Sequence, residues 1–427
     1  MEIGFVGLGK LGLPVSVAIA QMGHSVYGYD VDQTKLERYR KGISDLYEPD
    51  LDTQLQAVLR TNAHGSLFIV NSVRETVLGK DIVFIAVPTP STKQGNFDLS
   101  YVVESVEAIG QEMKAAESNS KLPVVTIIST MLPMSMRKHI APAFEKASGL
   151  KVSGNVGLAY SPQFIAMGTT IWDYLNPEFC LIGESDPRSG QVLEDYYQTI
   201  VSSACPKLHM SWENAEATKM GYNTMIGFKI VYANTLMEMC HKMPYADVDV
   251  ISNALSKATV RIVGPRYLRG GMGDSGACHP RDNLALSWLS RQLKLAASPF
   301  GFVMEARANQ AEWLAKLLLS YKKPVVIMGV RYKPNTNLID GSSSLQVADF
   351  LKKTGIKPLI YDPLVNGYSK PPPKEAATFL IAQDCAFVHN FDYPPHSVIV
   401  DVWRCFSKAE SDRPLVRYIA VGRHPTQ

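Results

Sequence analysis

Short runs of apolar, largely β-branched residues alternate with longer stretches of helical periodicity along the first third of the chain. Five of these runs predict strands, at residues 2–8, 25–31, 81–87, 124–130 and 155–161. Strands that alternate with helices pair in parallel and are covered on both faces. The pattern therefore predicts an α/β domain in the N-terminal part of the chain.

The same alternation starts again after about residue 320. A helix is predicted at 342–355, and strands are predicted at 324–330, 357–363, 397–403 and 418–422. Between the two patterns, residues 213–243 form one stretch that is too long and too apolar for a surface helix. We expect a buried connecting helix, of a kind that often also forms a dimer core. The predicted fold class is α/β, with two Rossmann-like parallel-sheet domains joined by a long central helix.

Composition places the chain among soluble globular proteins, because 46% of its 427 residues are hydrophobic and 19% are charged. A net charge of +3 argues against broad nucleic-acid binding but leaves room for a local basic pocket. No apolar run is long enough to span a membrane, and the N-terminus reads as a strand, not a signal peptide. The six cysteines include no CxxC pair, so we expect reduced thiols in a cytoplasmic protein and see no metal signature.

A glycine-rich turn follows the first predicted strand. Gly7, Gly9 and Gly12 have the GxGxxG spacing, between a strand and a helix, and Asp30 ends the second predicted strand. Such glycines permit a tight turn, close approach of a pyrophosphate and close helix packing. An acid at the position of Asp30 accepts hydrogen bonds from the ribose hydroxyls and repels a 2′-phosphate. The turn therefore predicts a dinucleotide site that favours NAD over NADP.

A second glycine-rich stretch, "GGMGDSGACHPRDN", covers residues 270–283 and contains Cys278. From the residues alone, Cys278 could be a nucleophile, a metal ligand or a small residue in a tight turn. It is the one cysteine of the six with glycines upstream to give access to it. Lys219 and Asn223 lie four residues apart in the central helical stretch and therefore share one face of that helix.

Several motifs, in order along the chain, resemble the UDP-glucose/GDP-mannose 6-dehydrogenase family. "AEATKMGYNTMIGFKI" at 215–230 is similar to the family's AExxKxxxNxxxxxKI helix, and 271–283 is similar to its GxGxGGSCxPKD loop. "GVRYKPNTNLIDGSS" at 329–343 resembles its GLxFKPNTDDxRxSP segment. The resemblance implies an NAD-binding Rossmann domain at 1–205, a central helical dimerisation region with the catalytic cysteine loop at 206–315, and a nucleotide-sugar-binding Rossmann-like domain at 316–427.

The resemblance also implies a reaction and the residues that serve it. The family oxidises a sugar C6 alcohol to a carboxylate with two NAD, through a thiohemiacetal and a thioester on its cysteine. The implied catalytic residues are Cys278, Lys219, Asn223, Asp282 and Thr130. The implied NAD-binding residues are Gly7, Gly9, Lys10, Leu11, Gly12, Asp30, Val87, Pro88, Thr89, Ser129 and Thr130. The implied nucleotide-sugar-binding residues are Gln163, Phe164, Ile165, Met167, Lys219, Asn223, Arg261, Tyr267, Arg269, Gly273 and Lys333.

The chain departs from the family pattern in its substrate loop. Gln163 and Met167 stand where the family has two glutamates, and Asp340 stands where it has an arginine. Methionine cannot take a proton, so a family candidate for activating the hydrolytic water is missing. His279 is the obvious substitute, because imidazole titrates near neutrality. That role requires its ring to face the thioester, whereas neighbours in an extended segment point apart.

Three functions remain open from the sequence. The chain is a full nucleotide-sugar dehydrogenase acting on a UDP-hexose, a variant that stops at the aldehyde or acts on an unusual nucleotide sugar, or a non-catalytic NAD and nucleotide-sugar sensor. The β-hydroxyacid dehydrogenases share the Rossmann domain but lack both the cysteine and a second α/β domain. We expect a homodimer with a nucleotide-sugar substrate and no nucleic-acid or membrane partner.

Overall fold

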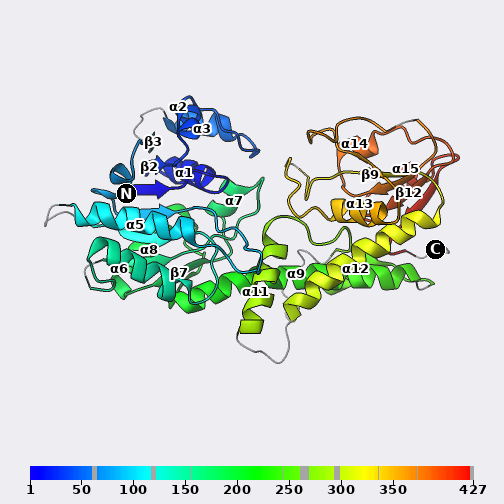
Figure 1. Cartoon of the computed structure of the whole chain (residues 1–427). Coiled ribbons are helices and arrows are strands. Elements are labelled where there is room, and N and C mark those ends of the chain that lie inside the picture. Colours follow the sequence, from blue (N-terminus) through cyan, green and yellow to red (C-terminus); the bar gives the residue numbers. More distant parts are fainter. Residues whose placement is uncertain are drawn as a thin grey trace. The chain divides into compact units, whose positions relative to one another are not determined.

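The fold is taken from a computed structural model that describes residues 1–59, 65–116, 122–154, 156–242, 244–259, 269–292, 299–334, 336–372 and 374–423. The chain divides into two compact units, residues 1–221 and 222–427. Each unit is built around one sheet with helices against it, as Figure 1 shows.

The first unit holds an eight-stranded sheet in the order β3-β2-β1-β4-β5-β6-β7-β8, parallel except where β6 meets β7. Its strands are β1 (Glu2–Val6), β2 (Ser25–Tyr29), β3 (Ser66–Ile69), β4 (Ile82–Ile85), β5 (Val124–Ile127), β6 (Leu158–Tyr160), β7 (Cys180–Glu184) and β8 (Lys207–Met210). The five predicted strands are all present. No strand was predicted at the positions of β3, β7 and β8.

Helices cover both faces of this sheet. They are α1 (Gly12–Gln21), α2 (Gln33–Arg40), α3 (Leu51–Leu59), α4 (Val73–Val77), α5 (Ser100–Lys114), the π-helix η1 (Met136–Ile140), α6 (Ala141–Ser148), α7 (Thr170–Leu175) and α8 (Pro187–Ile200). Side chains of β4 alternate between two cores: Ile82 and Phe84 pack with residues of α1, α3 and α8, whereas Val83 and Ile85 pack with residues of α5 and α6. A strand buried on both faces explains the continuous apolar run of its sequence.

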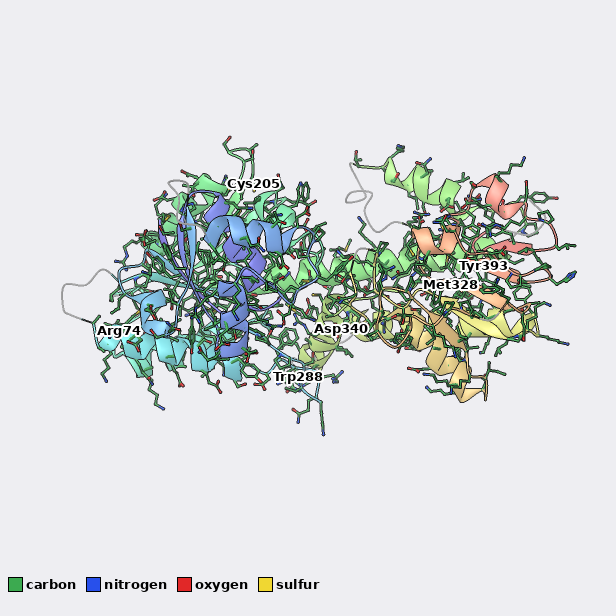
Figure 2. The ribbon with its side chains drawn as sticks, turned by 90° about the horizontal axis from the view of Figure 1, so that it is seen from above. Arg74, Cys205, Trp288, Met328, Asp340 and Tyr393 are labelled. Carbon is green, nitrogen blue, oxygen red and sulfur yellow. The ribbon has the colours of Figure 1, made fainter. Side chains whose placement is uncertain are left out.

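The second unit holds a five-stranded, wholly parallel sheet in the order β10-β9-β11-β12-β13. Its strands are β9 (Val325–Met328), β10 (Leu359–Tyr361), β11 (Thr378–Ile381), β12 (Val398–Asp401) and β13 (Arg417–Ala420). Its helices are α10 (Val248–Ser256), α11 (Cys278–Gln292), α12 (Pro299–Ser320), α13 (Ser343–Lys353), α14 (Ala386–His389) and α15 (Lys408–Ser411). One face packs with α12 and α13, and the other carries the aromatic cluster that includes Met328 and Tyr393, both labelled in Figure 2.

Helix α9 (Trp212–Lys242) begins in the first unit and ends in the second. It confirms the predicted central helix. The fold class predicted from the sequence is thus confirmed, with one mainly parallel and one wholly parallel α/β sheet and one long helix between them in the chain. Among the described residues, no helix combines the length and the apolarity that crossing a bilayer requires.

The two sheets repeat one local feature where their first strand ends. Gly7 and Gly329 both have positive φ, at +94° and +103°, and both donate their N–H to the last residue of the neighbouring strand at 2.8 Å. In each unit an aspartate after that neighbouring strand, Asp30 or Asp362, accepts a hydrogen bond from the residue after the glycine. The third position of the turn is Gly9 in the first unit and Arg331 in the second.

Candidate active site

The turn between β1 and α1 has the shape that a bound pyrophosphate requires. A Cβ on Gly12 would lie 1.8 Å from the carbonyl oxygen of Gly7, so only glycine lets the helix start this close to the strand. A Cβ on Gly9 would meet no atom within 4 Å, so open space lies beside this backbone. The N-terminal N–H groups of α1 follow directly and favour an anion there.

Asp30 is fixed against this turn by backbone donors. Its Oδ2 accepts from the Leu8 N–H at 2.8 Å and its Oδ1 from the Asp32 N–H at 3.0 Å, and the residue is 8% exposed. The turn and the carboxylate therefore fit the two ends of an adenosine diphosphate moiety. Of the other predicted residues here, Lys10 is exposed and Leu11 is half-buried.

The ends of β4 and β5 form a second wall of the predicted NAD site. These strands are neighbours in the sheet, so the segments that follow them meet. The Ser129 hydroxyl donates to the Val87 carbonyl at 2.7 Å, and the Thr89 hydroxyl donates to the Thr130 carbonyl at 2.8 Å. Pro88, between the two bonded residues, is exposed. The structure thus brings these predicted residues together.

The predicted substrate loop after β6 is held by a hydrogen-bonded network. The Gln163 amide donates to the Ser161 carbonyl at 2.8 Å and to the Tyr197 hydroxyl at 3.0 Å, and Lys219 donates to the Gln163 carbonyl at 2.8 Å. The Lys219 ammonium also lies 4.8 Å from the centre of the Phe164 ring. A carboxylate could not donate to Ser161, so glutamine at position 163 is matched to its surroundings.

Further along this loop, Ile165 packs at the edge of the core and Met167 is half-buried. Glu48, which the sequence did not single out, holds the end of the loop. Its carboxylate accepts from the N–H of Gly168 at 2.8 Å and from the N–H of Thr170 at 2.5 Å. No spacing or motif ties Glu48 to a segment about 120 residues away, so only the fold reveals this contact.

Glu216 also received no role from the sequence, although it lies within the family-like segment at 215–230. It is fully buried on α9, three residues before Lys219, and accepts from the N–H groups of Met134 and Met136 at 2.7 and 2.8 Å. Burial raises its pKa to about 7, against the opposing effect of the two N–H donors. It fixes the turn that carries the segment after Thr130 into η1.

Because the folded-state pKa of Glu216 lies above the unfolded value, the stability it contributes is full below about pH 4.5 and is lost as pH rises through about 7. In the wild type we expect the free energy of unfolding to fall by up to about 3 kcal/mol between pH 5 and 8 because of Glu216. Glu216→Gln should not show this fall. Denaturant unfolding of both proteins across that range measures this. Glu145→Gln, at a partly exposed acid whose pKa the Lys151 hydrogen bond lowers, is the control and should keep the wild-type slope. If the free energy of unfolding changes with pH in the same way in wild type and Glu216→Gln, Glu216 does not have a raised pKa.

In the second unit, Cys278 is exposed and is the first residue of α11. This corrects the expectation of an extended segment around His279. Pro280 is the third helical residue, where a missing N–H costs no intrahelical hydrogen bond. His279 therefore projects from the first turn of a helix, and its Nδ1 lies 3.0 Å from Oδ1 of the buried Asp274. A carboxylate in this position fixes the orientation of an imidazole.

Asn223 and Asp282 form a buried pair in the same unit. The Asn223 amide donates to Asp282 Oδ2 at 2.5 Å, and Arg281 donates to Asp282 Oδ1 at 3.2 Å. Asn223 is 6% exposed and Asp282 is fully buried. The structure thus joins two of the predicted catalytic residues, which lie 59 positions apart in the sequence.

The cysteine loop packs against the segment that resembles the family's FKP motif. A Cβ on Gly276 would lie 3.1 Å from the Tyr332 ring, and one on Gly341 would lie 2.3 Å from the Gly276 carbonyl. Lys333, which follows Tyr332, is half-buried. Asp340, labelled in Figure 2, is exposed just before Gly341. The residue before the predicted sugar-binding lysine thus packs against the loop that leads to Cys278.

The remaining predicted substrate residues have mixed placements. Arg269 donates to the Trp403 carbonyl at 2.5 Å, so its guanidinium is engaged within the unit. Gly273 is buried, and its carbonyl accepts from Ser343 at 2.7 Å. Arg261 and Tyr267 lie outside the described residues.

The chain matches two sequence models of known domains. Residues 1–201 match the NAD binding domain of the UDP-glucose/GDP-mannose dehydrogenase family, and residues 213–309 match the central domain of that family. Together the two matches cover more than half of the chain.

Individual relatives agree with these matches. The chain is 29% identical over 363 residues to GDP-mannose 6-dehydrogenase of Pseudomonas aeruginosa, covering 85% of this chain and 81% of that protein. It is 24% identical over 451 residues to UDP-glucose 6-dehydrogenase YwqF of Bacillus subtilis, covering 99% and 98%. Among solved structures, a UDP-glucose dehydrogenase from Pyrobaculum islandicum superposes with a TM-score of 0.87 at 28% identity, over 99% of this chain and 98% of that one.

Proposed function

The chain belongs to the UDP-glucose/GDP-mannose dehydrogenase family, and within that family we propose that it oxidises the C6 hydroxyl of a UDP-hexose to the uronate through a thioester on Cys278. The family membership supports the NAD-dependent oxidation of a nucleotide sugar. The observation that carries the finer proposal is the position of Cys278, exposed at the first residue of α11.

The chemistry follows from what an accessible thiol can do. The C6 alcohol loses a proton and a hydride and becomes an aldehyde, to which the Cys278 thiol adds to give a thiohemiacetal. Loss of a second hydride and a proton gives a thioester, and water then releases the carboxylate and the free thiol. NAD, when bound at the Gly7–Gly12 turn, supplies the hydride acceptor. Two NAD are reduced for each sugar oxidised, and three protons are released.

The polar groups described in the two units have distinct roles in this proposal. The partial positive charge at the start of α11 stabilises negative charge that develops on an oxygen next to Cys278. Asn223, held by Asp282, presents a fixed amide to a sugar oxygen or to water, and Asp282 receives a proton. Lys219 binds the substrate loop through Gln163 and contributes a positive charge. Thr130 and Ser129 support the turn beside the cofactor.

We propose His279 as the base that activates water for thioester hydrolysis, since Met167 cannot accept a proton. Asp274 orients the imidazole through Nδ1, which is the arrangement that a general-base histidine requires. This hypothesis explains how hydrolysis proceeds with a methionine at position 167. A homodimer is also proposed, through the α9 face on which Met225 and Tyr232 are 50% and 53% exposed.

The test is the number of NADH formed per sugar consumed, with a panel of UDP- and GDP-sugars. Two NADH and one uronate support the proposal. One NADH with an aldehyde product supports the variant that stops early, and binding without NADH supports a sensor; either result overturns full oxidation. If a modified nucleotide sugar is oxidised faster than every UDP-hexose, the proposed substrate is wrong but the proposed chemistry stands.

The same assay examines His279. We expect His279→Gln to carry out both hydride transfers once and then to accumulate the acyl-enzyme, which mass spectrometry of the quenched protein detects. Unchanged steady-state turnover without an acyl-enzyme would remove His279 from the mechanism and leave Cys278 in it.

A further inference from the structure

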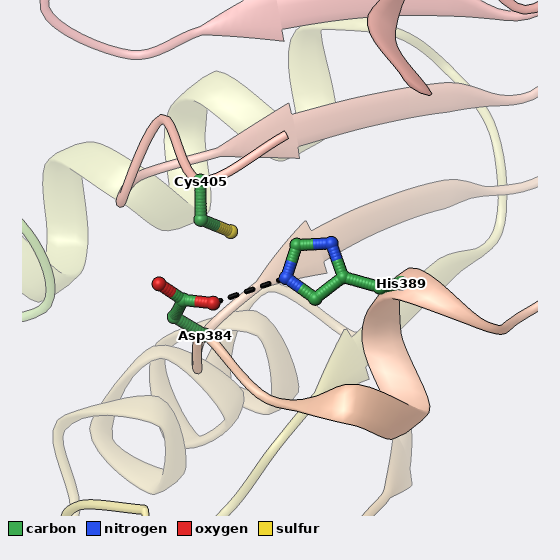
Figure 3. Close-up of side chains that lie close together, drawn as sticks. All are labelled: Asp384, His389 and Cys405. Carbon is green, nitrogen blue, oxygen red and sulfur yellow. Dashed lines mark hydrogen bonds and ion pairs between the residues drawn. The ribbon is translucent and has the colours of Figure 1, made fainter. Parts of the chain in front are cut away.

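Three side chains with metal-binding donors meet at the carboxyl end of the second sheet. Asp384 follows β11, His389 ends α14, and Cys405 lies in the loop after β12, as Figure 3 shows. One donor atom of each lies within 4.8 Å of the donors of the other two. Carboxylate oxygen, imidazole nitrogen and thiolate sulfur are the ligands that Zn²⁺ accepts.

Each ring nitrogen of His389 lies at hydrogen-bond distance from a carboxylate. Its Nδ1 lies 2.7 Å from Glu410 Oε1, and its Nε2 lies 3.0 Å from Asp384 Oδ1. In protein zinc sites one ring nitrogen binds the metal while the other donates to a carboxylate, which fixes the ring. Glu410 supplies that second carboxylate here, so Nε2 is directed toward Asp384.

Cys405 is held in place by its loop. The fully buried carboxylate of Asp401 accepts from the N–H groups of Trp403, Arg404 and Cys405 at 2.8 to 2.9 Å and from the Tyr418 hydroxyl at 2.8 Å. Its Oδ1 also lies 3.7 Å from the Cys405 sulfur. The thiol thus stands on a loop that is already ordered by four strong donors, which lowers the entropy cost of metal binding.

The charges around the cluster favour a cation. Asp384, Glu410 and Asp401 surround the sulfur and the imidazole. The nearby Arg413 donates to the backbone carbonyls of His389 and Phe391. A dication would offset the negative charge of the three carboxylates.

We propose that Asp384, His389 and Cys405 bind Zn²⁺, with Glu410 orienting the histidine. Tetrahedral ligands of zinc lie about 3.5 Å apart. His389 Nε2 and Asp384 Oδ1 already lie 3.0 Å apart, so the movement required is an approach of the Cys405 sulfur by about an ångström. The Asp384 side chain is 48% exposed, which leaves the fourth position to water. Binding releases the Cys405 thiol proton to solvent and joins the loops after β11 and β12. The role is structural and is independent of the proposed oxidation.

The probe is Co²⁺ alone, titrated into the full-length protein under reducing conditions. We expect a thiolate-to-cobalt charge-transfer band together with the intense visible bands of tetrahedral cobalt, both removed by added Zn²⁺. Cys405→Ser should abolish the charge-transfer band, and Glu410→Gln should weaken cobalt affinity about 10- to 100-fold. Cys205→Ser, at a half-buried thiol of the first unit, is the matched control and should keep the band.

Asp384→Asn provides a second variant at an exposed position, where folding is not at risk, and should raise the cobalt concentration for half-saturation at least about tenfold. A wild-type protein without the charge-transfer band, or a band that survives in Cys405→Ser, overturns the proposal. Neither result bears on NADH formation, so failure here leaves the proposed function intact.

Discussion

Cys278→Ser is expected to abolish uronate formation, with a loss of at least about 10³-fold in the rate at saturating substrate. A serine hydroxyl is a weak nucleophile, so little hemiacetal forms for the second oxidation, and an oxygen ester is hydrolysed more slowly than a thioester. The first hydride transfer does not need the thiol, so a slow release of one NADH per sugar can persist. Rapid-quench measurement of NADH and of the carboxylate product resolves the two steps.

Folding should not be affected by this change, because Cys278 is exposed and starts its helix. Serine is also a suitable residue at a helix start. Cys205→Ser serves as the control for thiol loss elsewhere and should retain full turnover. Carboxylate made at the wild-type rate by Cys278→Ser would remove the thioester from the mechanism.

Arg404→Ala should destabilise the second unit by about 3–5 kcal/mol, because it removes a buried guanidinium and leaves three backbone carbonyls without its hydrogen bonds. The Arg404 side chain is fully buried and pairs with Asp249 at 2.7 Å. It also donates to the carbonyls of Val402, Val421 and Gly270, at 2.6, 2.8 and 2.5 Å. Alanine would leave these three acceptors without that donor and would release the start of the cysteine loop at Gly270.

Denaturant unfolding measures the loss, and limited proteolysis between residues 269 and 278 reports the released loop. Arg423→Ala is the matched control, because Arg423 contacts the same Asp249 at 3.2 Å but is 42% exposed. Exposed pairs contribute about 1 kcal/mol or less. Equal losses of unfolding free energy in the two variants would show that the buried network contributes no more than an exposed ion pair.

The fold was largely predictable because its strands are buried on both faces. The runs that became β4 and β9 are apolar at every position, and β1 is apolar after Glu2; such runs are easily recognised. Two of the three strands without a prediction, β3 and β8, are harder to recognise, whereas β7 is buried like the predicted strands. In β8, the sequence Lys207–Met210 has exposed positions and alternating polarity at the sheet edge, and β3 is likewise partly exposed at the other edge.

The candidate site was predicted only as far as motifs extend. The turn at Gly7–Gly12 has a local signature, whereas the bond between Asn223 and Asp282 depends on tertiary packing. Pro280 after a run of glycines was read as loop, although proline is well tolerated in the first turn of a helix. The donors at Asp384, His389 and Cys405 come from three separate segments, so their spacing along the chain carries no metal signature.

The turn that follows the first strand of each sheet bears on the order of steps in the proposed reaction. In the second unit, Arg331 takes the place of Gly9, and its guanidinium binds Asp362 at 2.9 Å while only 2% exposed. Because the Asp362 carboxylate is paired with Arg331, it does not accept hydrogen bonds from a ribose. The turn of the second unit is therefore a structural element and not a dinucleotide site. The proposed reaction nevertheless consumes two NAD at the corner formed by Gly7 and Asp30. Spent cofactor must therefore leave and fresh cofactor enter halfway through each catalytic cycle. A covalent tether on Cys278 would keep the half-oxidised sugar from escaping during that exchange.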